Sequence, residues 1–165
     1  MREVPLKFAR FWILQAIAVV AILLPVIASV ASSKALRSFG FFETAGALLW
    51  VVGFVFEVVA DGQKASFKRN GRKGFMTTGV WKYSRHPNYF GEALLWWGLW
   101  VYALPGLSGL LHLSIFGPVF ITVLLLFVSG IPLLEKSADA KYGADSDYRD
   151  YKRRTSIFIP LPPRR

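Results

Sequence analysis

Four stretches of this chain are apolar for about the length that a helix needs to cross a bilayer, which is roughly 20 residues. Charged residues make up 18% of the chain, whereas a soluble domain carries about 25%. We therefore predict an all-α fold, with residues 1–165 forming a single membrane-embedded domain, a polytopic helical bundle. The predicted transmembrane helices are residues 11–31, 44–60, 89–104 and 113–134, with a cytosolic basic loop at 61–88 and a helical cytosolic tail at 135–165.

The basic residues are distributed unevenly between the two sides of this predicted bundle. Eighteen of the twenty lysines and arginines fall before the first span, between the second and third, or after the fourth, and these segments share one side. Only Lys34 and Arg37 fall on the other side. The positive-inside rule then predicts a multi-pass protein with both termini in the cytosol, in the endoplasmic reticulum or a bacterial inner membrane. Because topology accounts for the net charge of +10, we expect no nucleic-acid partner.

Several polar side chains stand inside the predicted spans or at their ends, where an unpaired charge is costly. Glu57 and Asp61 are four residues apart and share one face of the second span. Asn88, Glu92 and Trp96 repeat at the same spacing at the start of the third span. The two spans run in opposite directions, so these groups lie at one depth and predict a polar pocket beside the basic loop. In the alternative interpretation, the two glutamates only pair with loop lysines or arginines at the interface.

The loop before the third span favours an anionic ligand. Residues 68–73 carry four cations next to glycines, a composition that suits phosphate oxygens, although the positive-inside rule explains it equally well. Lys68 is therefore a predicted cofactor-binding residue. Pro87 favours the first position of a helix, so Arg85 and His86 stand at the N-terminus of the third span, where anions bind.

One segment of this loop resembles the signature of a known family. Residues 79–92 read G-V-W-K-Y-S-R-H-P-N-Y-F-G-E and are similar to the steroid 5-alpha-reductase-like membrane enzymes, most closely to their DUF1295 branch. Supporting matches are E-x3-D-x-Q-K at residues 57–64 and Y-x2-Y-K-R-R followed by I-P within residues 148–160. The R-H-P-x-Y element is shared with isoprenylcysteine carboxyl methyltransferases, so the resemblance identifies the superfamily more strongly than the chemistry.

The resemblance implies a bundle whose cytosolic half encloses NADPH, which delivers hydride to a carbon–carbon double bond of an enone-like lipid or steroid. Carried over by motif position, the cofactor-binding residues would be Asp61, Arg69, Tyr83, Arg85, His86, Asn88, Tyr89, Glu92, Trp96, Glu135, Tyr148 and Arg153. Glu57 and Trp97 are the predicted substrate contacts, and no catalytic residue is assigned. Family members usually have further N-terminal spans. We therefore expect a fragment, an inactive member, or a short form that assembles with a partner chain supplying those spans.

Three functions stay open. The first is an NADPH-dependent oxidoreductase acting on CH–CH groups, or its cofactor-binding half, with membrane lipids and a hydrophobic small molecule as partners. The second is a membrane methyltransferase of the isoprenylcysteine carboxyl methyltransferase type; its S-adenosylmethionine would gain from carboxylates but has no use for clustered cations. The third is a non-catalytic membrane subunit. With no cysteine and two histidines, no metal site is predicted.

Overall fold

The computed structural model describes residues 3–32, 39–71 and 73–164, with side chains from Lys7 onward. Within these ranges the chain forms α-helices and short turns of tighter or wider helix, and no named β-strand. Lys34 and Arg37, the two basic residues predicted on the outer side, lie outside the described residues, as do Arg2, Arg72 and Arg165. The helices are α1 (Glu3–Ile22), α2 (Leu24–Ala31), α3 (Phe41–Arg69), α4 (Pro87–Ala103), α5 (Phe116–Val123), α6 (Ile131–Tyr142) and α7 (Ser146–Arg154).

Two helical stretches are long and apolar enough to cross a membrane. They are α3, with 29 residues, and the stretch Gly109–Tyr142, with 34 residues, which contains α5 and α6. α1 and α2 make a third such stretch if the two count as one span. α4, the third predicted span, has 17 residues and is shorter than these. The prediction of an all-α membrane bundle is confirmed, with two or three of its spans meeting this length among the described residues.

Two predicted boundaries differ from the observed helices. The first predicted span is broken at Leu23, where α1 and α2 meet at 53°, because Pro25 has no N–H to bond to the carbonyl one turn back. The second predicted span was expected to end at residue 60, yet α3 continues to Arg69. Residues 61–69 are polar enough to leave the bilayer but contain no proline, so the helix ends only at Asn70 and Gly71, where φ is 66°.

Glycines let α3 and α4 approach each other closely. A Cβ atom placed on Gly53 would lie 2.6 Å from the carbonyl oxygen of Gly91, and one on Gly91 would lie 2.6 Å from that of Gly53. Gly46 and Gly98 form a second close contact of the same kind, nearer the start of α3 and the end of α4. Small residues at such positions are what allow helix backbones to pack in a membrane, where no hydrophobic effect drives them together. The α3–α4 pair is therefore the frame on which the rest of the chain is arranged.

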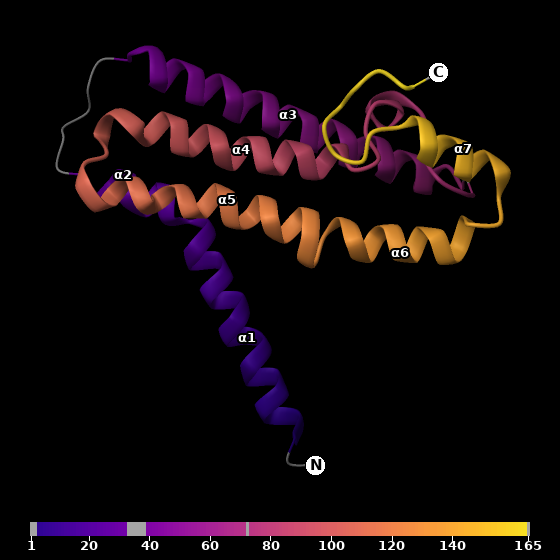
Figure 1. Cartoon of the computed structure of the whole chain (residues 1–165), viewed down its shortest axis with the longest axis horizontal. Helices are drawn as coiled ribbons and strands as arrows, with labels where there is room; N and C mark the ends of the chain where they lie inside the picture. Colours follow the sequence, from indigo (N-terminus) through magenta and orange to yellow (C-terminus); the bar gives the residue numbers. More distant parts are fainter. Residues whose placement is uncertain (1–2, 33–38, 72, 165) are drawn as a thin grey trace.

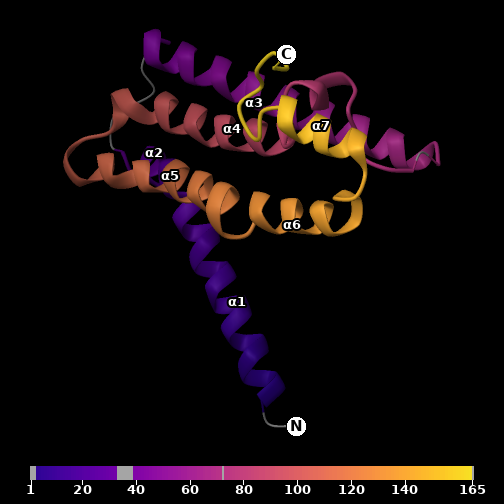
Figure 2. The ribbon, with the colours of Figure 1, turned by 45° about the vertical axis from the view of Figure 1, so that its right-hand side comes forward.

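The remaining helices are arranged around this pair (Figure 1). α4 lies between α3 and α5, α6 extends beyond α5, and α7 with the C-terminal segment lies beside the end of α3 and the start of α4 (Figures 1 and 2). α1 points away from the bundle in both views. A small buried core of Ala28, Ala103 and Leu107 joins α2 to the far end of α4. Many large apolar side chains are exposed, as expected for side chains that face lipid.

Candidate functional site

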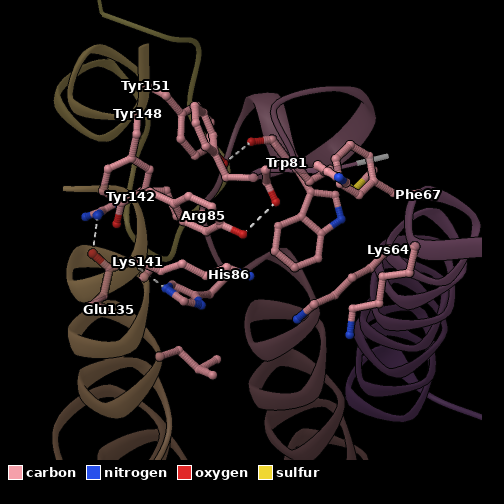
Figure 3. Close-up of a pocket in the computed structure, with 17 residues that line it drawn as sticks. Lys64, Phe67, Trp81, Arg85, His86, Glu135, Lys141, Tyr142, Tyr148 and Tyr151 are labelled. Atoms are coloured by element: carbon pink, nitrogen blue, oxygen red, sulfur yellow. Dashed lines mark hydrogen bonds and ion pairs between the residues drawn. The ribbon is translucent and has the colours of Figure 1, made fainter. Parts of the chain in front are cut away.

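A pocket of about 650 Å³ lies beyond the N-terminus of α4, between the end of α3 on one side and α6 and α7 on the other. This volume is within the range of roughly 300–1,000 Å³ that small-molecule and cofactor sites occupy. Figure 3 shows Lys64 and Phe67 entering from α3, and Glu135 and Tyr142 from α6. The lining residues are Lys64, Phe67, Lys68, Lys73, Gly74, Phe75, Met76, Trp81, Arg85, His86, Leu134, Glu135, Ala138, Lys141, Tyr142, Tyr148 and Tyr151.

The charge of the pocket wall is strongly positive. Five lysine or arginine side chains line it: Lys64, Lys68, Lys73, Arg85 and Lys141. Glu135 is the one carboxylate among the lining residues, and it is already engaged by cations of the protein. A pocket of this composition favours an anion with several oxygen atoms, because lysine and arginine bind such oxygens through charge-assisted hydrogen bonds.

Arg85 and His86 enter the pocket at the start of α4. Pro87 occupies the first turn of the helix and His86 is its N-cap, so the backbone turns sharply just before the helix and presents both side chains toward the pocket. The Arg85 guanidinium pairs with the carboxylate of Glu135, and the Nε2 atom of His86 lies 2.8 Å from Glu135 Oε1. The Nε atom of Arg85 is buried and has no hydrogen-bond partner among the described residues, which leaves one strong donor of the wall unused.

A second cation supports Glu135 from α7. Lys152 Nζ lies 3.3 Å from Glu135 Oε2 and also donates to Asp139. Partial burial opposes the charge of Lys152, but its hydrogen bonds to Asp139 and Glu135 outweigh this and raise the pKa of Lys152 above its ordinary value. The ammonium therefore stays charged and ties α7 to α6 behind the pocket.

Aromatic side chains form much of the remaining wall. The ring of Phe75 contacts Tyr148 edge-on at 5.2 Å and stacks on Tyr151 at 5.8 Å between centroids. Tyr151 Oη donates a hydrogen bond to the carbonyl of Trp81 at 2.7 Å, and burial raises the pKa of Tyr151 well above its ordinary value. On the opposite wall, Lys64 Nζ lies 5.1 Å from the centre of the Trp81 ring. Flat faces on both sides suit a ligand that contains rings as well as charged oxygens.

The polar groups of α3 and α4 that were predicted to form the pocket lie outside it. Asn88 Nδ2 donates to Asp61 Oδ1 at 3.1 Å, so the predicted meeting of α3 and α4 polar groups is confirmed at this pair. Glu57 and Glu92 stand on the same two helices and have no ion pair among the described residues. None of these four residues is among those that line the pocket.

The predicted site residues therefore fall into two groups. Those that line the pocket are Lys68, Arg85, His86, Glu135 and Tyr148. Those that do not are Glu57, Asp61, Arg69, Tyr83, Asn88, Tyr89, Glu92, Trp96, Trp97 and Arg153. Tyr89 stacks on His86 at 5.9 Å and so stands next to the pocket, whereas Arg153 is 76% exposed and pairs with Asp150. Trp97 faces α5, where its Nε1 atom donates to Thr122.

Several lining residues were not predicted as site residues. Lys64 belongs to the family match at residues 57–64 but was not predicted to contact the cofactor. It stands one turn from Lys68 on the same helix face. Lys141 and Tyr142 end α6 and reach the pocket because α6 lies against it, a placement that no local pattern indicates. Among the described residues, no group of three or more histidine and acidic side chains has the geometry to hold a metal ion.

Comparison with known proteins gives a family but no activity. A family model described as "Protein of unknown function (DUF1295)" matches residues 1–155. An uncharacterized protein of Schizosaccharomyces pombe is 28% identical over 145 residues, which cover 75% of this chain and 40% of that protein. The chain thus spans well under half the length of this relative. No solved structure matches.

Proposed function

This chain belongs to the DUF1295 family, and from that membership and its cationic pocket we propose that it is a membrane-embedded NADPH-dependent reductase, or the cofactor-binding part of one. The observation that carries the proposal is the wall of the pocket, with five lysine or arginine side chains, one carboxylate and aromatic faces on both sides. NADPH has three phosphates and two flat rings, so it needs both features at once.

Different residues of the pocket would bind different parts of NADPH. Lys64, Lys68 and Lys73, at the α3 side, would hold phosphate oxygens. Trp81 and the tyrosines of α7 would give the rings apolar surfaces and keep water away from them. When bound, NADPH would supply hydride to a carbon–carbon double bond of an enone-like lipid, and no residue of this chain is assigned to that step.

The orientation in the membrane follows from the same proposal. Lysines and arginines concentrate around the pocket and the C-terminal helix, so the pocket would open to the cytosol, where NADPH is available. A bacterial inner membrane and the endoplasmic reticulum both meet this condition.

The methyltransferase alternative fits the pocket less well. S-adenosylmethionine carries a sulfonium cation and no phosphate, so carboxylates are the side chains it needs. Glu57 and Glu92, which have no ion pair within the described ranges, lie outside the pocket, and Glu135 pairs with Arg85.

Direct titration tests the proposal. The chain is purified in detergent and titrated with NADPH, NADH and S-adenosylmethionine, with binding followed by nicotinamide fluorescence and by heat. We expect saturable binding of NADPH, and weaker binding of NADH because it lacks the additional phosphate. Binding of S-adenosylmethionine alone would favour the methyltransferase, and binding of none of the three would favour a non-catalytic subunit.

The contribution of the pocket lysines to NADPH binding can be tested with alanine variants, and a neighbouring arginine serves as the control. Lys68→Ala and Lys73→Ala should each weaken NADPH binding about tenfold, the loss expected for one charge-assisted hydrogen bond of about 1.4 kcal/mol. Arg69→Ala is the matched control, because Arg69 is exposed and does not line the pocket. Equal losses in all three variants would mean that the affinity reflects general positive charge rather than this pocket.

A further inference from the structure

The backbone turn that presents Arg85 and His86 to the pocket is held partly by its own residues and partly by a later segment of the chain. The N–H groups of Tyr83 and Ser84 bond back to the carbonyl of Val80, as part of the preceding 3₁₀ turn. The next two N–H groups have no such partner: that of Arg85 donates to the carbonyl of Ser156, and that of His86 donates to the Ser84 hydroxyl. The backbone N–H of Arg85 is therefore held from a distant part of the chain, whereas that of His86 is held by the neighbouring Ser84 side chain.

The support comes from residues 156–164, which we call the C-terminal strap. Arg85 N–H reaches Ser156 at 2.8 Å, and Leu161 N–H donates to the carbonyl of Tyr83 at 3.0 Å. The strap is thus bonded to the turn on both sides of Ser84, and Ser84 and Ser156 form an isolated parallel bridge. Figure 1 shows the C-terminal segment lying over the start of α4.

Ser84 joins the strap to His86 through a single hydroxyl. Its side chain is fully buried, at 0% exposure. Ser84 Oγ donates to the carbonyl of Phe158 at 2.7 Å and accepts from the N–H of His86 at 3.1 Å. Loss of the hydroxyl would leave a buried N–H and a partly buried carbonyl without these partners, which costs free energy.

The strap is anchored at both ends without touching the pocket. Arg164 N–H donates to the carbonyl of Arg154, and Arg154 Nε donates to the carbonyl of Arg164, so the far end is fixed to α7. The ring of Phe158 packs edge-on against Phe90 of α4 at 5.7 Å. No strap residue lines the pocket. The strap's backbone hydrogen bonds to the turn, at Tyr83 and Arg85, are its contacts nearest to Arg85 and His86.

We propose that Ser84 and the C-terminal strap are positioning elements that hold Arg85 and His86 in their binding orientation, so that the affinity of the pocket depends on a segment outside it. The proposal deepens the proposed function in that NADPH is the ligand used to measure affinity. The positioning itself can be measured without any ligand, through the accessibility of the His86 ring, which is buried at 6% exposure.

The test uses the full chain with His112→Gln, which leaves His86 as the single histidine. Ser84→Ala removes the hydroxyl, and Leu161→Pro removes the N–H that donates to Tyr83. Ile159→Ala is the control within the strap, because that side chain is exposed and makes none of the contacts described above. Two quantities are measured: the NADPH affinity, and the rate at which diethyl pyrocarbonate modifies His86, followed by ultraviolet absorbance. Both are compared at temperatures equally far below each variant's own unfolding midpoint.

Ser84→Ala and Leu161→Pro should each weaken NADPH binding about tenfold, the equivalent of one hydrogen bond, and should speed modification of His86 severalfold. Ile159→Ala should change neither. Unchanged reactivity of His86 in the two variants would overturn the positioning role, whatever happens to affinity, and so would an equal increase in the control. If the parent chain does not bind NADPH, the proposed function fails, and the reactivity of His86 alone decides the role of the strap.

Discussion

Replacing Gly53 or Gly91 with alanine is expected to destabilise the bundle by about 3 kcal/mol, the upper part of the usual range for overpacking. Each added Cβ would lie 2.6 Å from a carbonyl oxygen of the facing helix, closer than a real Cβ approaches. The obstruction is backbone, so no side chain can rotate away and α3 and α4 must separate. Unfolding in detergent, followed by circular dichroism, measures the loss.

Gly62→Ala is the matched control on the same helix. A Cβ on Gly62 meets nothing within 4 Å, and alanine favours a helix over glycine by about 0.5–1 kcal/mol. This variant should therefore be as stable as the parent or slightly more stable. If Gly53→Ala unfolded under the same conditions as the parent, the close packing of α3 on α4 described here would be wrong.

The second large effect is expected at Glu135. Replacing it with alanine should cost about 3 kcal/mol, because removal of one partner from a buried ion pair leaves the other charge without compensation. The side chains of Glu135 and Arg85 are only 16% and 12% exposed, and His86 and Lys152 lose the same partner. The unfolding midpoint in detergent is again the measurement.

Two further variants test whether the loss of stability in Glu135→Ala comes from the broken buried ion pair or would follow the loss of any ion pair. Asp150→Ala breaks the exposed pair with Arg153 and should cost under about 1 kcal/mol. Replacing Arg85 and Glu135 together with methionine removes both charges, and should recover much of the stability lost by Glu135→Ala. A double variant no more stable than Glu135→Ala would argue against the ion pair as the cause.

Local rules predicted the parts of this structure that depend on neighbouring residues. Apolar length predicted the membrane helices, because a segment in the bilayer must satisfy its own backbone. Pro87 predicted the start of α4, with Arg85 and His86 just before it. Hydropathy marks where a helix leaves the bilayer, however, and not where it ends, which is why the extension of α3 to Arg69 was missed.

Long-range placement was harder to predict. Helical spacing correctly brought Asp61 and Asn88 to one depth. It could not say that the pocket lies beyond this pair, with neither residue in its lining. The contact between His86 and Glu135 joins residues 49 positions apart. No periodicity sets the register of α6 against α4, and Glu135 came only from the resemblance. The same register places Lys141 and Tyr142, at the end of α6, in the pocket wall.

The order of charges along α3 affects the direction from which a charged ligand can approach the pocket. Glu57, Asp61, Lys64 and Lys68 follow one another at spacings of four, three and four, so one helix stripe changes from negative at the bilayer level to positive at the pocket. An anion arriving sideways through the lipid would be repelled by the two carboxylates before it met a lysine. One arriving from the water meets attraction from the start. This order of charges would favour entry of a negatively charged ligand from the aqueous side over a lateral route through the lipid.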